Sequence, residues 1–376
     1  MLYKNFLVGL LFICYFSNCG EETVGEPQLL NCEPIDNIVY SANYGFNPLG
    51  TNGLAEFEVE GRPVLASLSG EQIFVFDIED GTLNREFTVP TEGKYKIEAL
   101  SEFDGMVVAP DSSIIYSSNR LNTIYLIQDS IITKLHSFDV EGDDIRLVSN
   151  FQCTPIYANN KAIFSTFRHP ASISDTKRAF VTVNSQKGFE LKEIIPFSNL
   201  YFENFYSTQP YFYWAAIRYC PWRNSFLVSF PVDNRIWEYD EFFNLLGTVN
   251  ASSTLFSEVV PFSEPVSADN LPDPQLSAKY FRETSHFCGL MVNEQERKVY
   301  RMTRYCIPLE DGSFDYQYSL IALNEELDID HEFILPDSHT PYTTYAYGQG
   351  IQVFNQNAYN EVGDTVFLPF STFDCD

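Results

Sequence analysis

The chain has 376 residues, of which 51 are acidic and 23 are lysine or arginine, so its formal net charge at pH 7 is −28. That charge argues against nucleic-acid binding, which needs a basic face for the phosphate backbone, and against adsorption to anionic lipid. Hydrophobic residues make up 45% of the chain, which predicts a folded protein with a large core.

The first 18 residues have the pattern of a secretion signal. Lys4 precedes an apolar run over residues 6–16, which is too short to span a bilayer and has the length of a signal-peptide core. The run ends in Ser17-Asn18-Cys19-Gly20, which resembles the lipobox of bacterial lipoproteins, although Asn18 stands where Ala or Gly is usual. The resemblance implies cleavage before Cys19 and attachment of lipid, with acyl chains such as palmitate, to that residue. Ordinary secretion with an unmodified Cys19 is the alternative.

These features divide the chain into a signal peptide (residues 1–18), a tether (19–33) and a single β domain (34–376). Glu21 and Glu22 directly after Cys19 resemble the acidic export tag of Bacteroidetes-type surface lipoproteins, but a solvated linker explains them equally well. We therefore expect a lipid-anchored protein of the bacterial cell envelope, at the outer membrane. The sequence leaves open whether its body is periplasmic or surface-exposed.

Five segments of the β domain share one design, an apolar strand, a polar turn and a second apolar strand. These hairpins are expected at residues 73–90, 123–135, 179–196, 235–249 and 318–336. Further strand-like runs precede them, for example residues 113–118, 162–167 and 225–230. Successive hairpins are about 50 residues apart, except where a Pro- and Ser-rich insert over residues 252–275 lengthens the interval. A four-stranded unit of about 50 residues is the length of a propeller blade.

The two ends of the domain are expected to complete the ring. The C-terminal runs at residues 350–354 and 365–370 are too short for a blade, and the N-terminal run at residues 36–41 could supply the missing strand. Closure of this kind removes exposed sheet edges, which otherwise promote aggregation. The favoured fold is therefore an all-β, six-bladed β-propeller, with seven blades or paired β-sandwiches as alternatives.

The lipobox, the acidic body and the units of about 50 residues together resemble uncharacterised propeller-like lipoproteins of the Bacteroidetes type. The resemblance covers nearly the whole chain. It implies a fold and a location, and no reaction.

Six cysteines remain if Cys14 leaves with the signal peptide and Cys19 carries lipid. An even number of cysteines in an exported protein permits disulfides. Cys32 and Cys375 lie at opposite ends of the domain, so a bond between them would clamp the termini of the ring. The sequence has no CxxC motif and no pair of histidines at metal-ligand spacing, so it predicts neither a metal site nor a cofactor.

Cationic residues are scarce in this chain, so four arginines that recur at similar places are candidates for ligand binding. Each is expected near the end of the second strand of its unit, which we take to face the ligand-binding side of a propeller. Converging on the central channel, they would bind an anion such as a carboxylate or a sulfate on a sugar. Salt bridges with the many carboxylates are the alternative. The candidate residues are Arg120, Arg168, Arg218 and Arg304, with Tyr219, Trp222 and Tyr305 as stacking surfaces.

The sequence thus predicts an envelope protein that binds a ligand or a protein partner through one propeller face. The expected partners are the membrane, through the N-terminal lipid, and an anionic glycan or an envelope protein; nucleic acid is not expected. An envelope glycan hydrolase or lyase and a structural subunit of an envelope complex are the alternatives. No GxSxG, SxxK or P-loop pattern occurs, and 51 acidic residues do not single out a catalytic pair.

Overall fold

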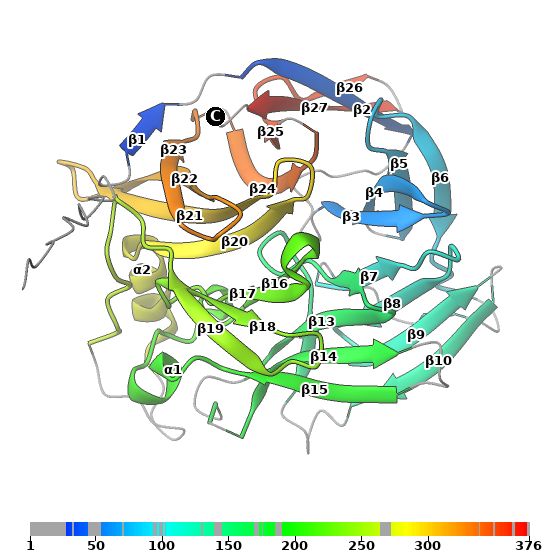
Figure 1. Cartoon of the computed structure of the whole chain (residues 1–376), viewed down its shortest axis with the longest axis horizontal. Helices are drawn as coiled ribbons and strands as arrows, with labels where there is room; N and C mark the ends of the chain where they lie inside the picture. The colour runs from blue at the N-terminus through cyan, green and yellow to red at the C-terminus, as the bar shows by residue number, and fades with distance from the viewer. Residues whose placement is uncertain are drawn as a thin grey trace, which may run out of the picture.

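The strand-like runs of the sequence fold as antiparallel strands in a ring of small sheets. The computed structural model describes residues 28–31, 34–43, 54–69, 71–92, 96–97, 101, 103–128, 131–138, 145–168, 173–174, 176–184, 190–263, 272–337, 339–348, 350–362 and 365–373. Within these residues, six sheets follow one another around a central axis (Figure 1). The fold is an all-β, six-bladed propeller, which confirms the favoured prediction over seven blades or paired β-sandwiches.

The first three blades occupy the right and lower parts of Figure 1. Blade I consists of β3 (Leu54–Val59), β4 (Arg62–Ser69), β5 (Gln72–Asp77) and β6 (Leu83–Thr88). Blade II consists of β7 (Gly105–Val108), β8 (Ile114–Ser118), β9 (Thr123–Gln128) and β10 (Ile131–Ser137). Blade III consists of β11 (Arg146–Val148), β12 (Ile156–Ala158), β13 (Lys161–Phe167), β14 (Arg178–Asn184) and β15 (Glu190–Pro196).

The last three blades complete the ring, and two of them receive an N-terminal strand. Blade IV consists of β16 (Ala216–Cys220), β17 (Ser225–Ser229), β18 (Arg235–Tyr239) and β19 (Leu245–Asn250). Blade V consists of β20 (His286–Asn293), β21 (Lys298–Pro308), β22 (Phe314–Leu323), β23 (Ile329–Ile334) and β1 (Gln28–Asn31). Blade VI consists of β24 (His339–Ala346), β25 (Ile351–Asn355), β26 (Asn360–Val362), β27 (Thr365–Phe373) and β2 (Asp36–Asn43).

The N-terminal strand β2 closes the ring as the sequence predicts. It pairs antiparallel with the C-terminal strand β27 along its whole length, from Asp36 opposite Thr372 to Asn43 opposite Thr365. The preceding strand β1 pairs in parallel with β23 on the outer edge of blade V. It lies within the segment that the sequence assigns to the tether, so the N-terminal part of the chain is attached to two blades.

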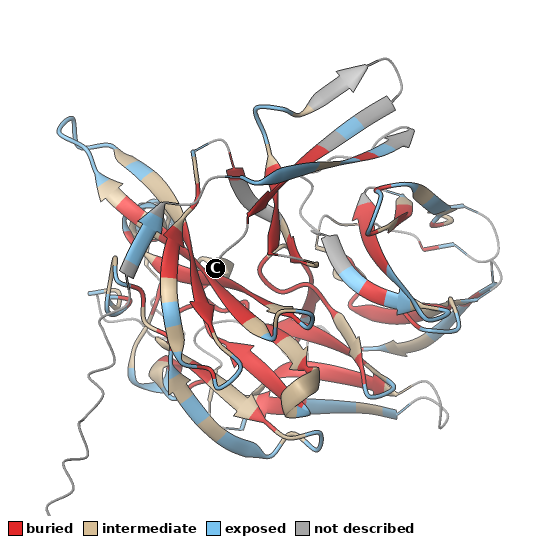
Figure 2. Ribbon diagram, turned by 45° about the horizontal axis from the view of Figure 1, so that its top comes forward, coloured by how far each residue is buried: buried red, intermediate tan, exposed pale blue. Residues whose placement is uncertain are grey.

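The core lies between the blades, on the inner and middle strands. All five residues of β8 and all five of β17 are buried, because each strand is covered on both faces by neighbouring blades. The outer strands β6 and β19 are largely exposed. Figure 2 shows this gradient from buried inner strands to exposed outer strands and turns.

Short helices occupy the connections between blades. α1 (Leu200–Glu203) and the 3-10 helix η2 (Pro210–Phe212) lie between blades III and IV, and α2 (Pro274–Glu283) lies between blades IV and V. A further 3-10 helix, η3 (Pro221–Arg223), forms the turn after β16. Asp273 caps α2, because its carboxylate accepts the Gln275 N–H at 2.6 Å. In the described part of the chain, no helix is both long enough and apolar enough to cross a membrane.

Candidate ligand-binding cavity

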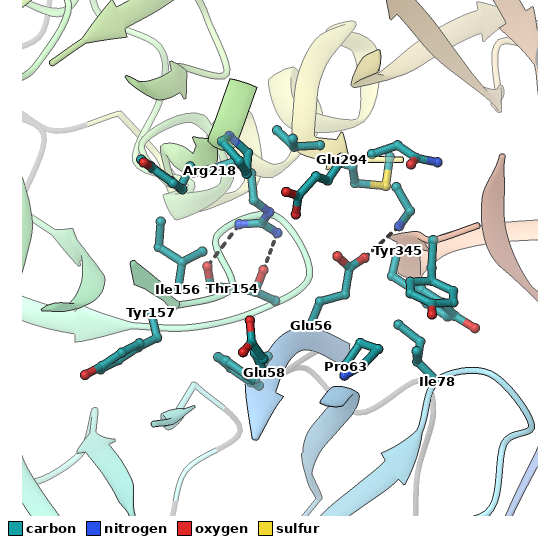
Figure 3. Close-up of a pocket in the computed structure, with 18 of the residues that line it drawn as sticks. Glu56, Glu58, Pro63, Ile78, Thr154, Ile156, Tyr157, Arg218, Glu294 and Tyr345 are labelled. Atoms are coloured by element: carbon teal, nitrogen blue, oxygen red, sulfur yellow. Dashed lines mark hydrogen bonds between the residues drawn. The ribbon is translucent and has the colours of Figure 1, made fainter. Parts of the chain in front are cut away.

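The inner strands of the blades end around a cavity of about 450 Å³. Its walls come from the C-terminal halves of β3, β16, β20 and β24 and from the turns that follow them. We call this space the channel cavity and define it by its polar lining, which includes Glu56, Glu58, Thr154, Arg218, Glu294 and Tyr345. Figure 3 shows these side chains around one common space.

An interruption of blade III forms part of the wall. Both β11 and β12 pair with β13, with Val148 opposite Ser165 and Ile156 opposite Ile163. Residues 149–155, the central loop, therefore span one register position of β13 and loop out of the sheet. Gln152, Cys153 and Thr154 in this loop are buried.

The central loop packs closely against the inner strand of blade II. A Cβ atom at Gly105 would lie 2.7 Å from Cβ of Ser149 and 3.0 Å from Cγ of Pro155. Any side chain at this position of β7 would therefore push the loop away, so blade II needs a glycine here. Thr154 and Pro155 at the end of the loop line the cavity.

Arg218 connects blade IV to the central loop. Its Nη1 donates to the carbonyl oxygens of Ile217, at 2.8 Å, and of Thr154, at 3.2 Å. Its Nη2 donates to the hydroxyl of Thr154. Burial lowers the pKa of Arg218, and the nearby carboxylate of Glu56 opposes that shift. The guanidinium is thus held in place by the protein while part of its surface faces the cavity.

Glu56 lies on β3 and faces Arg218 across the cavity. Its carboxylate accepts the N–H of Ala346 at 2.8 Å, which joins blade I to blade VI. The surrounding protein keeps bulk water away from the carboxyl group, and this desolvation raises the pKa of Glu56 from 4.5 to about 7. The Ala346 N–H and Arg218 oppose the shift. The side chain is nevertheless accessible to solvent through the cavity. A carboxylate of this kind can gain or lose a proton near neutral pH.

Two more carboxylates face the same space. Glu58 follows Glu56 by two residues on β3, so both side chains lie on the same face of the strand. Glu294 follows β20 directly, and its side chain, like that of Glu58, is exposed. Neither carboxylate forms a hydrogen bond or ion pair with another described residue. The described lining of the cavity therefore carries three carboxylates and one guanidinium.

Of the seven residues that the sequence predicts as ligand contacts, two line this cavity, Arg218 and Tyr219. The Tyr219 hydroxyl donates to Oδ1 of Asn224 at 2.6 Å, so the ring has a fixed position at the cavity wall. Trp222 belongs to η3 just beyond, and its indole N–H donates to the carbonyl oxygen of Glu325 at 3.4 Å. Tyr305 is half-buried on β21, away from the described lining.

The other three arginines lie elsewhere, which corrects the expected convergence of four. Arg120 is exposed in the turn after β8. Arg168 is buried, and its Nη2 lies 2.5 Å from Oε2 of Glu193. Arg304 lies against the rings of Phe281 and Tyr316. Its Nη1 also donates to the carbonyl oxygen of Phe281, near the end of α2, at 3.0 Å.

The antiparallel arrangement of each blade explains why the four arginines do not converge. Arg120 and Arg168 follow the ends of second strands, as predicted, and Arg304 lies within the second strand β21, whereas Arg218 lies on β16, the first strand of its blade. Neighbouring strands run in opposite directions, so first strands end at one face of the ring and second strands at the other. The channel cavity opens among the ends of first strands.

The cysteines within the described residues are free thiols. Cys153, Cys220, Cys288 and Cys306 are all buried and unpaired. Cys19, Cys32 and Cys375 lie outside the described residues, so the lipidation and the terminal disulfide stay predictions. Nor do the described His, Cys, Asp and Glu side chains gather in any group of three that could hold a metal ion.

Sequence comparisons find neither a matching family model nor a matching curated protein. The structure is similar to the crystal structure of a DUF4221 family member from Bacteroides vulgatus, with a TM-score of 0.71 and 16% identity, covering 92% of this chain and 98% of that one. Virginiamycin B lyase from Staphylococcus aureus matches with a TM-score of 0.42 and 11% identity over 89% of this chain and 99% of the lyase. Regucalcin from Agrobacterium tumefaciens matches at 0.44 and 8% identity over 92% and 95% of the two chains. The chain thus shares its propeller fold with a Bacteroides protein, in agreement with the resemblance drawn from the sequence.

Proposed function

We propose that this chain is a lipid-anchored envelope protein that binds a small polar organic ligand in the channel cavity. The observation that carries the proposal is the convergence of polar side chains from five blades on one space of about 450 Å³. Cavities of this size that combine apolar walls with a few placed polar groups are typical of small-molecule sites. Met291, Val292 and Ile78 supply apolar walls beside the charged groups.

The position of β1 determines which part of the propeller the proposed anchor would hold near the membrane. Eight residues separate Cys19 from Gln28, where β1 begins. Such a segment spans at most about 30 Å when extended. Lipid on Cys19 would therefore hold the outer edge of blade V close to the membrane.

Metabolic labelling with an alkyne-tagged palmitate tests the anchor. The wild-type protein should incorporate the label and sediment with membranes, and Cys19→Ala should lose the label. Cys14→Ala is the matched control, because Cys14 lies within the predicted signal peptide and its loss should leave labelling unchanged. Equal labelling of Cys19→Ala and wild type would contradict the anchor.

Ligand-observed NMR on the detergent-solubilised full chain tests the binding function. We expect small polar fragments from a library of amines, alcohols and carboxylates to bind, and Glu58→Trp to abolish binding by filling the cavity. Glu86→Trp on the exposed outer strand β6 of the same blade is the control and should bind like wild type. Binding that Glu58→Trp leaves intact would place the ligand elsewhere and contradict the proposal.

The enzymatic alternative is supported by Glu56, because a carboxyl group that titrates near neutral pH is suited to general acid–base catalysis. Incubation of the protein with a glycan panel distinguishes the two functions. Turnover that Glu56→Gln abolishes, while ligand binding survives, would favour a hydrolase or lyase over a binding protein.

A further inference from the structure

Resting on the binding function proposed above, we infer that the channel cavity selects organic ligands that carry a protonated amine. This class of ligand differs from the anions that the sequence indicated. The protein itself occupies the guanidinium of the cavity far more than its carboxylates, and this difference favours a cation.

The guanidinium of Arg218 is largely committed to the protein. Both hydrogens of Nη1 are donated to backbone carbonyl oxygens, and Nη2 donates to the Thr154 hydroxyl. An anionic ligand would have to use the remaining donors while lying beside the carboxylates of Glu56, Glu58 and Glu294. The negative charges of these carboxylates would repel an anion in the same cavity and oppose its binding.

The carboxylates are far less occupied than the guanidinium. Glu56 accepts the Ala346 N–H with one oxygen, and its second oxygen has no hydrogen-bond donor among the described residues. Glu58 and Glu294 accept no hydrogen bond from any described group. Acceptors that the fold leaves open are the groups that a ligand with N–H donors would satisfy, and a cationic N–H donor forms the stronger bond.

A metal ion fits this cavity less well than an organic cation. Ca²⁺ requires about six to eight oxygen ligands at about 2.3–2.6 Å from one point. The described carboxylates of the cavity form no cluster that could hold a metal. Glu58 comes from blade I and Glu294 from blade V, so a ligand that contacts both also contacts two blades.

Aromatic rings in the lining offer packing surfaces for the rest of the ligand. Tyr157, Tyr219 and Tyr347 line the cavity around the carboxylates. The face of a tyrosine ring attracts a cation and also packs against apolar or sugar surfaces. A protonated amine on a compact ring or sugar would use both the carboxylates and the tyrosines.

Glu56 then gives the site a distinct pH response. The charged or titratable side chains that face it are Arg218 from β16, Glu58 from β3, Glu294 after β20 and Tyr345 from β24, with Tyr40 from β2 hydrogen-bonded to Tyr345 behind them. An amine binds best when Glu56 has lost its proton. Its affinity should therefore rise between about pH 6 and pH 8, where a primary amine stays protonated and Glu56 becomes charged.

Saturation-transfer NMR with benzylamine, benzyl alcohol and benzoate tests the inference, because the three probes have nearly the same shape and differ in charge. At about pH 8 benzylamine should bind at least ~10-fold more tightly than either of the others, the size of one modest charge interaction. Replacing all three carboxylates together, Glu56→Gln with Glu58→Gln and Glu294→Gln, should abolish that preference, whereas Glu86→Gln on β6 should keep it. Glu56→Gln should remove the rise in affinity with pH.

The possible failures are distinguishable. Equal binding of benzylamine and benzyl alcohol, or tighter binding of benzoate, would overturn the amine preference while the cavity remained a binding site. A preference for benzylamine that survives replacement of all three glutamates by glutamine would also overturn it. If none of the three probes bound, both the amine preference and the proposed binding function would be contradicted.

Discussion

Arg218 donates a hydrogen bond to the carbonyl oxygen of Thr154, 3.2 Å away and 64 residues earlier in the chain. This bond joins the inner strand of blade IV to the central loop of blade III. It also fixes the single described guanidinium of the channel cavity in the wall. The shape of the cavity therefore depends on the loop, and the position of the loop depends on Arg218.

Replacement of Thr154 by valine should loosen this junction. The substitution preserves the shape of the side chain and removes the hydroxyl that accepts from Nη2 of Arg218. We expect a loss of about 1–2 kcal/mol in the free energy of unfolding, because a donor of the charged, partly buried guanidinium loses its partner. Urea denaturation measures this change. Thr248→Val on the exposed strand β19 is the control, and an equal effect in both variants would show that the junction contributes nothing.

Closure of the ring should depend on Tyr40. Its ring on β2 packs edge-on against Phe76 and Phe370, at centroid distances of 5.4 and 5.3 Å, and its hydroxyl donates to the carbonyl oxygen of Ile78 at 3.2 Å. Tyr40→Ala should cost about 3–5 kcal/mol of stability, as for other large aromatic residues removed from a core. Val39→Ala on the same strand should have little effect, since Val39 is 47% exposed. Similar denaturation midpoints for the two variants would contradict the role of Tyr40 in closing the ring.

The repeated hairpins made the blades visible in the sequence, because alternation of apolar and polar residues is a local property of a strand. The hairpin expected at residues 123–135 corresponds to β9 and β10, and the closing strand expected at 36–41 corresponds to β2. The number of blades followed from the spacing of these hairpins. Closure of the ring by the N-terminal run is confirmed by the pairing of β2 with β27.

The inner strands were harder to predict, because several are short or carry charge. β3 contains Glu56 and Glu58 and has no long apolar run, and β7 has only four residues. Assigning Arg218 to a second strand placed it with the wrong group of arginines. Nothing local distinguishes Glu56 from the other acidic residues, since its partner Ala346 lies 290 residues away. The central loop (residues 149–155) could not be predicted from the sequence either, because only the pairing of its flanking strands β11 and β12 with β13 defines it.

Arg301 should stabilise the contact between blades IV and V. This fully buried residue of β21 donates to Oγ of Ser229 and to the carbonyl oxygen of Ala251, each at 3.0 Å. Arg301→Met would leave these buried acceptors without the guanidinium donor, at a cost of about 1–3 kcal/mol for each group left unsatisfied. Arg297→Met, which removes an exposed ion pair with Glu325, should cost less than about 1 kcal/mol. Chemical denaturation of both variants checks the difference, and comparable losses would contradict the structural role of Arg301.

Counting thiols tests the terminal disulfide. In the native protein the four described cysteines should react slowly with a thiol reagent, because all are buried and burial raises the pKa of each thiol. After unfolding without reductant, lipidated protein should show four reactive thiols if Cys32 is bonded to Cys375. Six reactive thiols would contradict the disulfide. Cys32→Ser should then leave five, by freeing Cys375.

The pKa of Glu56 predicts a pH dependence of stability. In the folded protein this pKa is about 7, above its ordinary 4.5, so between these values the native state binds more protons at Glu56 than the unfolded state does. Glu56 therefore reduces stability progressively as pH rises through this range.

Glu56→Gln should remove this loss while its amide oxygen still accepts the Ala346 N–H. The melting temperature of the variant should match that of wild type near pH 4.5 and exceed it by roughly 2 °C at about pH 8. Differential scanning calorimetry across this range measures the difference. The same comparison for Glu86→Gln on β6 controls for the loss of one surface charge from a strongly acidic protein. A difference between Glu56→Gln and wild type that stays constant with pH would show that Glu56 titrates alike in the folded and unfolded chain.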